Sequence, residues 1–394
     1  MKSNILLTRK KTRRSTRKNV GRTDVISRDF ASFRNMSYIK KISVSLFQAP
    51  LVQSFRTALG DHDILENVLF VIEIDDGTKG YGEAAIAGHI TGETIEGTMR
   101  NLKSLEKMLL GSKPKQYLYI SKQLHERCEK NKSAVAAVET ALLDALTRQA
   151  GIPLWRLFGR RPQHLTTDIT IVIADLAETQ RTVKKFYNQG FRIFKIKVGR
   201  DPDLDYQRVL AVHRLAPRCK IYLDANQGYS AQQTLNFLQQ LKRTGIRPAL
   251  IEQPVPREDW EGLKEVTRLS QIPICADESV QSLADAIRLI KEKAAQAINI
   301  KLMKFGLIQS LKIAKLAQAN KIKLMIGGMM ETSLAMTTSA HLAAGLGGFH
   351  YIDLDTPFFI DPKFDKNPYL SRRGVYDLSK VKTGVGIIPF LHAA

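Results

Sequence analysis

Cysteine is scarce in this 394-residue chain, which contains only Cys128, Cys219 and Cys275. Their number is odd, and they do not form the close pairs that ligate zinc. The sequence therefore gives no disulfide framework and no thiolate metal site. This usage is typical of buried thiols in a reducing compartment, and we expect a cytoplasmic protein.

Long apolar runs are missing as well. No stretch reaches the roughly 18 apolar residues that a membrane-spanning helix needs, and the first residues lack the apolar segment of a secretory signal. No predicted strand is followed by the glycine-rich turn of a dinucleotide-binding fold. With 44 % hydrophobic residues the chain can still build a full core, so we expect a globular protein with no membrane partner.

Acidic residues are few relative to basic ones, with 38 Asp and Glu against 60 Lys and Arg and a net charge of +22. Residues 1–35 hold 11 of the basic and 2 of the acidic residues, hence +9, and we expect a basic, disordered tail over 1–37. Such a tail is compatible with nucleic-acid binding or with an organellar presequence, and a start of translation at Met36 is a plain alternative. The remaining net charge of +13 is spread over the rest of the chain, and we attribute it to the composition of the protein surface rather than to a nucleic-acid-binding site.

The first folded unit, residues 38–160, combines strands and helices. Alternating apolar residues predict three strands, with a polar loop between the first two and a hairpin turn at Asp76-Gly77. Helical periodicity follows, which gives an α+β unit. The predicted strands are 38–51, 67–75 and 80–85, the loop is 53–66, and the helices are 93–112 and 116–150.

Over residues 161–356 short apolar strands recur about every 25 residues, with amphipathic helices between them. Strands that alternate with helices indicate a parallel sheet, and eight of them favour a TIM-type barrel of the α/β class. A C-terminal segment, 357–394, follows. The predicted strands are Asp168–Ile173, Ile193–Val198, Ile221–Asp224, Leu250–Glu252, Ile274–Ala276, Ala297–Ile300, Leu324–Ile326 and Tyr351–Asp353.

Three consecutive barrel strands end in a carboxylate, at Asp224, Glu252 and Asp277. The C-terminal ends of barrel strands form the active site, so these side chains should converge there. An all-oxygen donor set suits Mg²⁺, or Mn²⁺, and no Cys or His pair competes for a softer metal. Acids after strands also cap helices, but three on successive strands favour a metal site.

Lysines flank these acids in sequence. Lys197 and Lys301 follow isoleucines in buried-type strands, which argues against solvated surface charges. A divalent cation and a second lysine, Lys195, should lower the pKa of such an amine toward neutrality and let it act as a base. The second and sixth strands stand on opposite sides of a barrel, so one amine could remove a proton and the other return it to the opposite face.

These residues lie in motifs that resemble the muconate-lactonising-enzyme subgroup of the enolase superfamily, over residues 38 to about 390. The resemblance implies a capping domain over a modified (β/α)7β barrel, a C-terminal segment returning to the cap, one Mg²⁺ per subunit, a homo-oligomer, and removal of a proton α to a carboxylate. It makes Lys197 and Lys301 the acid/base pair, Lys195 an enolate-stabilising neighbour, and Asp224, Glu252 and Asp277 the ligands. The motifs are Lys195-Ile-Lys197, Asp224-Ala-Asn226-Gln227, Ile251-Glu252-Gln253-Pro254, Ala276-Asp277-Glu278-Ser279 and Ile298-Asn-Ile-Lys301-Leu-Met-Lys304.

Within that subgroup, Asp353-Leu-Asp355 resembles the Asp-x-Asp element with which dipeptide epimerases hold the free α-ammonium of the substrate. Two carboxylates complement one cation, whereas the substrates of N-acylamino acid racemases, o-succinylbenzoate synthases and muconate cycloisomerases bring none. We therefore expect a dipeptide epimerase that inverts the C-terminal residue of an L,L-dipeptide. Those three activities remain alternatives, and nucleic-acid binding through the tail is a remote one.

The preferred dipeptide is less clear from sequence. The loop over residues 54–63 should close over the site, where Arg56 or His62 could reach an acidic side chain. Thr170, Gly328 and Met330 are expected to line the substrate pocket. L-Ala-L-Glu and a hydrophobic dipeptide both remain open.

Overall fold

The computed structural model describes residues 37–159 and 164–390. The described residues from Ser37 onward belong to one compact unit. The predicted basic tail lies, except for Ser37, outside the described residues. None of the described helices is both long and apolar enough to cross a membrane.

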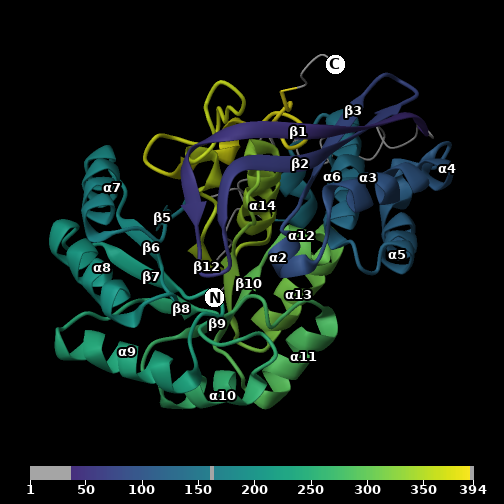
Figure 1. The fold of residues 1–394 in the computed structure, drawn as a ribbon. Helices are drawn as coiled ribbons and strands as arrows, with labels where there is room; N and C mark the ends of the chain where they lie inside the picture. The colour runs from purple at the N-terminus through teal and green to yellow at the C-terminus, as the bar shows by residue number, and fades with distance from the viewer. Residues whose placement is uncertain (1–36, 160–163, 391–394) are drawn as a thin grey trace, which may run out of the picture. The chain divides into compact units, whose positions relative to one another are not determined.

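An antiparallel sheet of three strands, β1–β2–β3, begins this unit (Figure 1). The polar loop predicted over 53–66 is wrong, because pairing resumes after a register shift between Pro50 and Phe55 and continues to Arg56 opposite Asp61. The half-exposed polar residues there are thus hairpin arms rather than a loop. The strands are β1 (Ile39–Arg56), β2 (Asp61–Ile74) and β3 (Lys79–Ala85).

Helices cover one face of this sheet. The long helix α6 packs so closely on β3 that a Cβ at Gly82 would lie 1.9 Å from the carbonyl oxygen of Ala137. The single helix predicted over 116–150 is in fact two, because Asn131 leaves helical geometry and its side-chain amide donates to Thr98 Oγ1 at 2.9 Å. The helices are α2 (Gly88–Thr91), α3 (Ile95–Ser104), α4 (Glu106–Leu109), α5 (Tyr117–Arg127) and α6 (Lys132–Gln149), with 3-10 turns η2 (Pro114–Gln116) and η3 (Leu154–Phe158).

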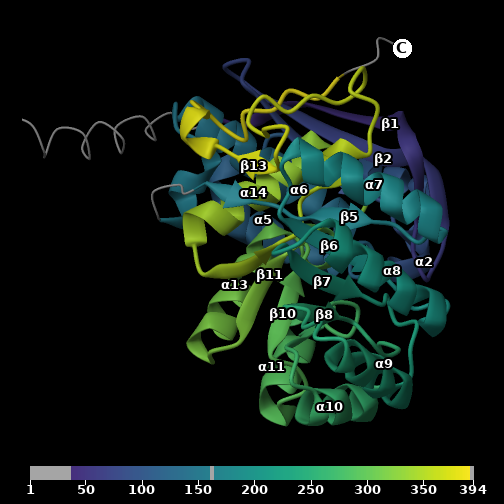
Figure 2. The ribbon, with the colours of Figure 1, turned by 90° about the vertical axis from the view of Figure 1, so that its left-hand side faces the viewer.

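Eight parallel strands follow in the order β5 to β12, with helices on the outside (Figures 1 and 2). The barrel closes where Asp168 N donates to Ile352 O at 3.0 Å and Leu354 N donates to Thr167 Oγ1 at 2.7 Å. This confirms the predicted barrel with its α+β cap. The strands are β5 (Ile169–Ile171), β6 (Ile193–Lys197), β7 (Lys220–Asp224), β8 (Leu250–Glu252), β9 (Ile274–Ala276), β10 (Ala297–Ile300), β11 (Lys323–Ile326) and β12 (Phe349–Ile352).

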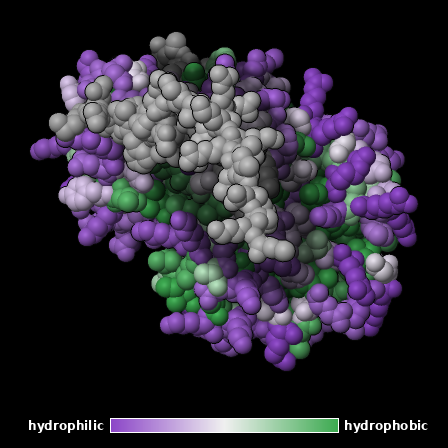
Figure 3. All heavy atoms as spheres, turned by 180° about the vertical axis from the view of Figure 1, so that it is seen from behind, coloured by the Kyte–Doolittle hydropathy of each residue, from purple (hydrophilic) through white to green (hydrophobic). Residues whose placement is uncertain are grey.

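Most of the helices between these strands bury one face, whereas α12 (Leu302–Phe305) and α14 (Ser333–Leu346) are buried over almost their whole length. Most of these helices begin at a residue whose side chain caps the helix. The Asp175 side chain accepts from Glu178 N, and Ser230 and Gln233 form a reciprocal capping box. The coloured part of the face in Figure 3 is mainly hydrophilic, with smaller hydrophobic patches. The remaining helices between the strands are α7 (Leu176–Gln189), α8 (Pro202–Leu215), α9 (Ala231–Arg243), α10 (Trp260–Leu269), α11 (Leu283–Glu292) and α13 (Leu307–Ala319).

Strand alternation sorts the barrel residues into two sets. One set, which includes Leu223 and Ile251, packs in the main core between strands and helices. The other points into the barrel, where Tyr222, Leu250 and Cys275 belong to a separate interior cluster. Two residues further along β7, β8 and β9 the same inward face carries the three predicted metal ligands. The apolar cluster is therefore the floor beneath them.

The C-terminal segment contacts both parts of the unit. Asp361 N donates to Pro50 O of β1 at 3.0 Å, and Leu154 N donates to Gly384 O at 2.8 Å. Strand β13 (Val375–Tyr376) pairs with β4 (Leu165–Thr166), flanked by 3-10 turns η4 (Thr356–Phe358) and η5 (Leu378–Lys380). These contacts fit the predicted return to the cap, while the domain boundaries themselves stay a prediction.

Candidate active site

A cavity of about 260 Å³ lies at the C-terminal ends of the barrel strands, under the cap. The end of the β1–β2 hairpin reaches this region, since Ile173 N donates to Arg56 O at 3.1 Å and Arg200 pairs with Asp61 at 2.7 Å. Eight of the predicted site residues line the cavity: Thr170, Lys195, Lys197, Lys301, Gly328, Met330, Asp353 and Asp355.

The three predicted ligands lie buried beside these lysines. Strand register places Asp224 opposite Glu252, and Asp277 follows on the next strand. The Lys195 ammonium nitrogen lies 2.9 Å from Asp224 and 2.7 Å from Glu252. Lys301 lies 2.6 Å from the third carboxylate, Asp277. The acids and the lysines thus form one buried network of opposite charges.

The carboxylates of this network fit an oxygen-only metal site. Glu252 Oε2 and Asp277 Oδ2 are buried, and the ammonium groups beside them are those of Lys195, at 2.7 Å, and Lys301, at 2.6 Å. Burial acts to raise the pKa of Asp224 and Asp277, but the neighbouring lysines outweigh it and hold both well below their usual range. Burial and Asp224 together raise the pKa of Glu252 to about 8, so this carboxyl gains most from a nearby cation.

The two predicted bases have different partners. Lys197 donates to Asp224 at 2.7 Å and to Asn226 at 3.0 Å. Burial acts to lower the pKa of Lys301, but Asp277 and Glu252 outweigh it and raise that pKa above its ordinary value. The sequence predicts a pKa near neutrality for Lys301, but without a metal ion the neighbouring carboxylates shift this pKa in the opposite direction. A divalent cation held by the same carboxylates would reduce this effect.

An unusual backbone conformation just after two of the barrel strands helps to orient the site residues. Asn226 and Gln253 have φ of 40° and 33°, in the left-handed region that side chains rarely adopt. Hydrogen bonds of the Gln253 side-chain amide offset this backbone strain. Its oxygen accepts from Asp277 N at 3.0 Å, and its nitrogen donates to Ser279 Oγ at 2.7 Å. This amide joins the ends of β8 and β9 and holds Asp277 in place.

A buried arginine fixes the strand that carries Lys197. Arg208 on α8 is fully buried, and it donates to Lys197 O at 2.7 Å and to Val172 O at 2.6 Å. Its countercharge is Asp205 on the same helix, at 3.1 Å. Arg208 therefore ties α8 to the ends of β5 and β6 from behind the site.

Replacing Arg208 by methionine should destabilise the protein by about 3 kcal/mol, because Asp205 and two strand-end carbonyls lose a buried partner. Urea unfolding curves would measure this loss. Arg288→Ala, which removes an arginine that pairs with Glu292 at the exposed surface of α11, is the matched control and should cost far less. Equal losses in both variants would contradict the assigned role.

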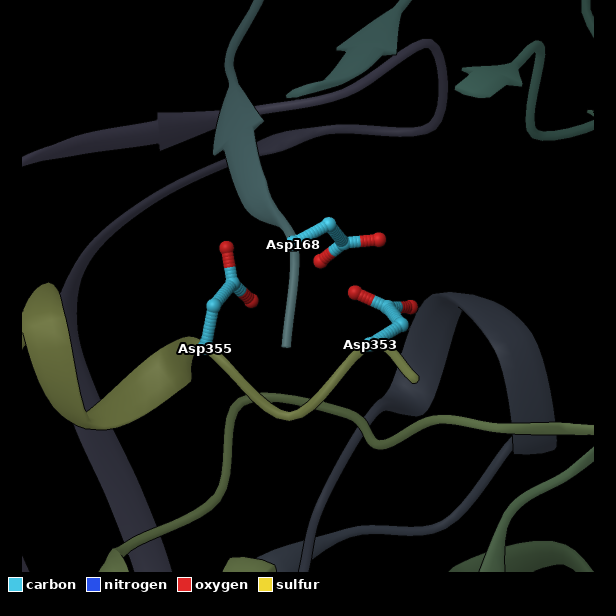
Figure 4. Close-up of side chains that lie close together, drawn as sticks. All are labelled: Asp168, Asp353 and Asp355. Atoms are coloured by element: carbon cyan, nitrogen blue, oxygen red, sulfur yellow. The ribbon is translucent and has the colours of Figure 1, made fainter. Parts of the chain in front are cut away.

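The other end of the cavity is acidic. Asp353 Oδ2 accepts from Lys195 at 2.6 Å, and Asp355 Oδ2 accepts from Thr170 N at 2.6 Å. A third carboxylate, Asp168, lies within 4.8 Å of both (Figure 4). Among the described residues, Asp168, Asp353 and Asp355 are the acids whose potential ligand atoms all lie within 4.8 Å of one another. The three predicted metal ligands do not form such a close group.

Sequence reasoning missed three polar residues that lie beside the predicted site residues. Asp168 precedes Thr170 by two residues, so strand alternation would have placed both inside the barrel. Asn299 stands in the same relation to Lys301, and its amide donates to Glu252 Oε1 at 2.6 Å. Lys304, the last residue of a quoted motif, donates to Asp277 Oδ1 at 2.6 Å.

Arg56 does not join the site. It follows Phe55, which lines the cavity, and its side chain lies instead 3.4 Å from Glu178 on α7. Successive residues of a strand point to opposite faces, which explains why the two differ. The predicted contact of Arg56 with substrate is therefore not found.

Two family models match the chain. Residues 41–159 match the mandelate racemase / muconate lactonizing enzyme N-terminal domain, and residues 178–389 match the enolase C-terminal domain-like family. Together they span the cap, the barrel after its first strand β5, and most of the C-terminal segment.

Individual relatives are similar over nearly the whole described chain. A hydrophobic dipeptide epimerase from Citrifermentans bemidjiense is 47 % identical over 359 residues, which cover 89 % of this chain and 98 % of the relative. The L-Ala-D/L-Glu epimerase from Bacillus subtilis, solved in a substrate-liganded complex, has a TM-score of 0.85 at 33 % identity, covering 89 % and 99 % of the two chains. A dipeptide epimerase from Enterococcus faecalis, complexed with Mg and L-Leu-L-Tyr, has a TM-score of 0.83 at 32 % identity, covering 89 % and 99 % of the two chains.

Proposed function

The chain belongs to the mandelate racemase / muconate lactonizing enzyme family of the enolase superfamily, and we propose that it is a Mg²⁺-dependent dipeptide epimerase. The reaction would invert the α-carbon of the C-terminal residue of an L,L-dipeptide. Because the reaction replaces one α-proton by another on the opposite face and leaves the composition of the substrate unchanged, the enzyme is an isomerase.

The observation that carries this proposal is the acidic end of the cavity. Buried carboxylates this close repel one another, and they call for a cation between them or a proton on one of them. The ammonium group of a free dipeptide supplies such a cation and can donate hydrogen bonds to the carboxylates of Asp353 and Asp355. An N-acylated amino acid offers no charge there. The site therefore favours a substrate with a free amine.

The two lysines provide the proton chemistry. Lys197 is on β6 and Lys301 follows β10, the second and sixth of eight strands, and both line the cavity. A substrate α-carbon between them would meet one amine on each face. One amine removes the α-proton and the other returns a proton to the opposite face, which inverts the centre. Lys195, between the acids and the cavity, can hold negative charge that develops on the substrate's carboxylate.

Asp224, Glu252 and Asp277 would hold the metal ion. All their donors are carboxylate oxygens, which Mg²⁺ prefers, and the E. faecalis relative was solved with Mg. When bound, the ion would supply positive charge that lowers the cost of removing the α-proton. One ion per subunit, replacement by Mn²⁺, and assembly into a homo-oligomer also belong to the proposal, and metal analysis with light scattering would test them.

The cavity walls favour hydrophobic side chains. The cap contributes Phe55, Leu59 and Ile86 to the lining, and the barrel adds Met329 and Met330. No arginine among the described residues lines the cavity, and its lysines are those already assigned to the reaction. A substrate glutamate would thus meet His62 but no arginine and no unassigned lysine, whereas apolar side chains would be buried against most of the lining. This choice agrees with the activity that gives the C. bemidjiense relative its name.

A mass-spectrometric screen of L,L-dipeptides in D₂O with Mg²⁺ tests the function. Epimerisation through a solvent-derived proton should add one dalton to a subset of free-amine dipeptides, with hydrophobic pairs ahead of L-Ala-L-Glu. The same dipeptides with an acetylated amine are the matched control and should not exchange. Exchange of N-acyl amino acids alone would replace the proposal by racemase activity.

The apparent affinity for dipeptides should fall as the pH drops below 7. Burial and the neighbouring Asp353 raise the pKa of Asp355 to about 7. Below that pH a proton replaces the charge that the ammonium group needs, so KM should rise by up to about tenfold for each further pH unit. Initial rates at saturating Mg²⁺ between pH 5.5 and 8.5 would measure KM. Asp355→Asn should raise KM at pH 8 and flatten the profile, and a wild-type KM that is constant from pH 6 to 8 would contradict the argument.

A further inference from the structure

The third carboxyl group at the acidic end, Asp168, has no assigned role so far. It immediately precedes β5, and its exposed fraction is 0 %. Neither of its oxygens accepts a hydrogen bond from any residue that the structure describes. Figure 4 shows its carboxyl group directed toward that of Asp353.

The three carboxylates differ in their donors. Asp353 has the Lys195 ammonium group, and Asp355 has the backbone N–H of Thr170. Asp168 has neither, although it is as deeply buried as they are. An ionised carboxylate without donors, beside two others, would carry a cost of several kcal/mol. A proton removes that cost, because the protonated carboxyl group becomes a hydrogen-bond donor to its neighbour.

We propose that Asp168 is a positioning residue of the amine subsite, whose carboxyl group stays protonated and donates a hydrogen bond to the carboxylate of Asp353. The role in binding the substrate's ammonium group rests on the proposed function, whereas the protonation of Asp168 does not. With the proton in place the cluster carries two negative charges rather than three. Asp353 is then held in one orientation, from which it can face Lys195 and a substrate ammonium group together.

The electrostatics of the surroundings agree with this arrangement. Burial, followed by Asp353 and Asp355, raises the pKa of Asp168 well above its ordinary value, against a smaller lowering effect of Lys195. The titratable and charged groups that face it from the neighbouring strands are Lys195 on β6, Tyr222 on β7, Glu252 on β8, and Asp353 and Asp355 after β12.

Infrared spectroscopy of the free enzyme tests the protonation directly. At pH 9, above the pKa of about 7 to 8 of buried acids such as Glu252 and Asp355, a carboxylic acid carbonyl band should persist. It should be lost in Asp168→Asn and kept in Asp175→Asn, which replaces a helix-capping acid at the exposed start of α7. A wild-type spectrum without the band, or a band that survives in Asp168→Asn, would overturn the proposal.

Kinetics test the positioning role. Asparagine retains an N–H donor for Asp353, whereas alanine does not, so the KM of Asp168→Ala for dipeptides should exceed that of Asp168→Asn by about tenfold or more. The kcat should change less, because both bases are untouched. If Asp168 instead binds the ammonium group as an ionised carboxylate, asparagine would be as harmful as alanine, and the proposal would fail.

The two kinds of failure are distinguishable. The infrared band is measured without substrate, so a wild-type enzyme that exchanges no dipeptide proton disproves the proposed function and leaves the protonation of Asp168 standing. Conversely, an active epimerase without the band retains the function and loses only the role of Asp168. Even if Asp168→Asn does not fold, a wild-type spectrum without the band overturns the protonation of Asp168.

Discussion

Replacing Lys301 by alanine should lower the rate of epimerisation by about 10²–10⁴-fold, since one of the two proton-transfer groups is lost. Lys301 lines the cavity and lies 2.6 Å from Asp277, so its amine is both accessible to substrate and held in place. Lys197→Ala should have an effect of similar size from the other face. Polarimetry or chiral chromatography of the dipeptide products would measure the rates.

The stereochemistry of residual exchange gives the sharper result. With one amine left, each variant should still exchange the α-proton of one epimer with deuterium, and the two variants should differ in which epimer they exchange. Lys312→Ala, on the exposed side of α13, is the matched control and should behave as the wild type. Wild-type turnover in both Lys197→Ala and Lys301→Ala would refute a two-base mechanism.

Replacing Glu252 by glutamine should weaken Mg²⁺ binding on the order of 100-fold. The ligand set loses one of three charges, and replacing even the groups that support metal ligands commonly costs about 10–100-fold in affinity. The volume of the side chain is unchanged, so the fold should persist. Calorimetric titration with Mg²⁺ would measure affinity, together with the Mg²⁺ dependence of the rate.

Glu261→Gln is the control for this change, because Glu261 is an exposed acid on α10 that pairs only with a surface lysine in the described structure. Its Mg²⁺ affinity should equal that of the wild type. If Glu252→Gln binds Mg²⁺ as tightly as the control, Glu252 does not belong to the ligand set, and the tight Asp168–Asp353–Asp355 group would be the next place to look.

The barrel could be predicted closely because its strands are buried on both faces. Leu250–Glu252 and Ile274–Ala276 are short apolar runs between polar helices, and both occur with the predicted bounds. The charged residue at or just after each run could only lie at the strand's C-terminal end. Chain order and alternation thus place lysines and carboxylates at one edge without further information.

The cap and the fine structure of the site depend on contacts between distant residues. The amide of Asn131 breaks a helix by bonding to Thr98, some thirty residues earlier in the chain. Arg56 could be excluded from the cavity only by knowing the strand register beyond the shift near Pro50, which turns Phe55 rather than Arg56 toward the cavity. Asp168 gave no motif signal, because its significance lies in its distance from Asp353, 185 residues later.

The division of the cavity wall also bears on how such enzymes diversify. Reacting groups come from barrel strands, whereas much of the apolar wall comes from two cap segments, residues 55–65 and 86–95. Substitutions in these segments can reshape the recognition of side chains while the proton-transfer groups keep their places. Grafting both segments from a relative with another preference should therefore transplant its selectivity onto an unaltered catalytic barrel. Modularity of this kind lets one reaction serve many dipeptides.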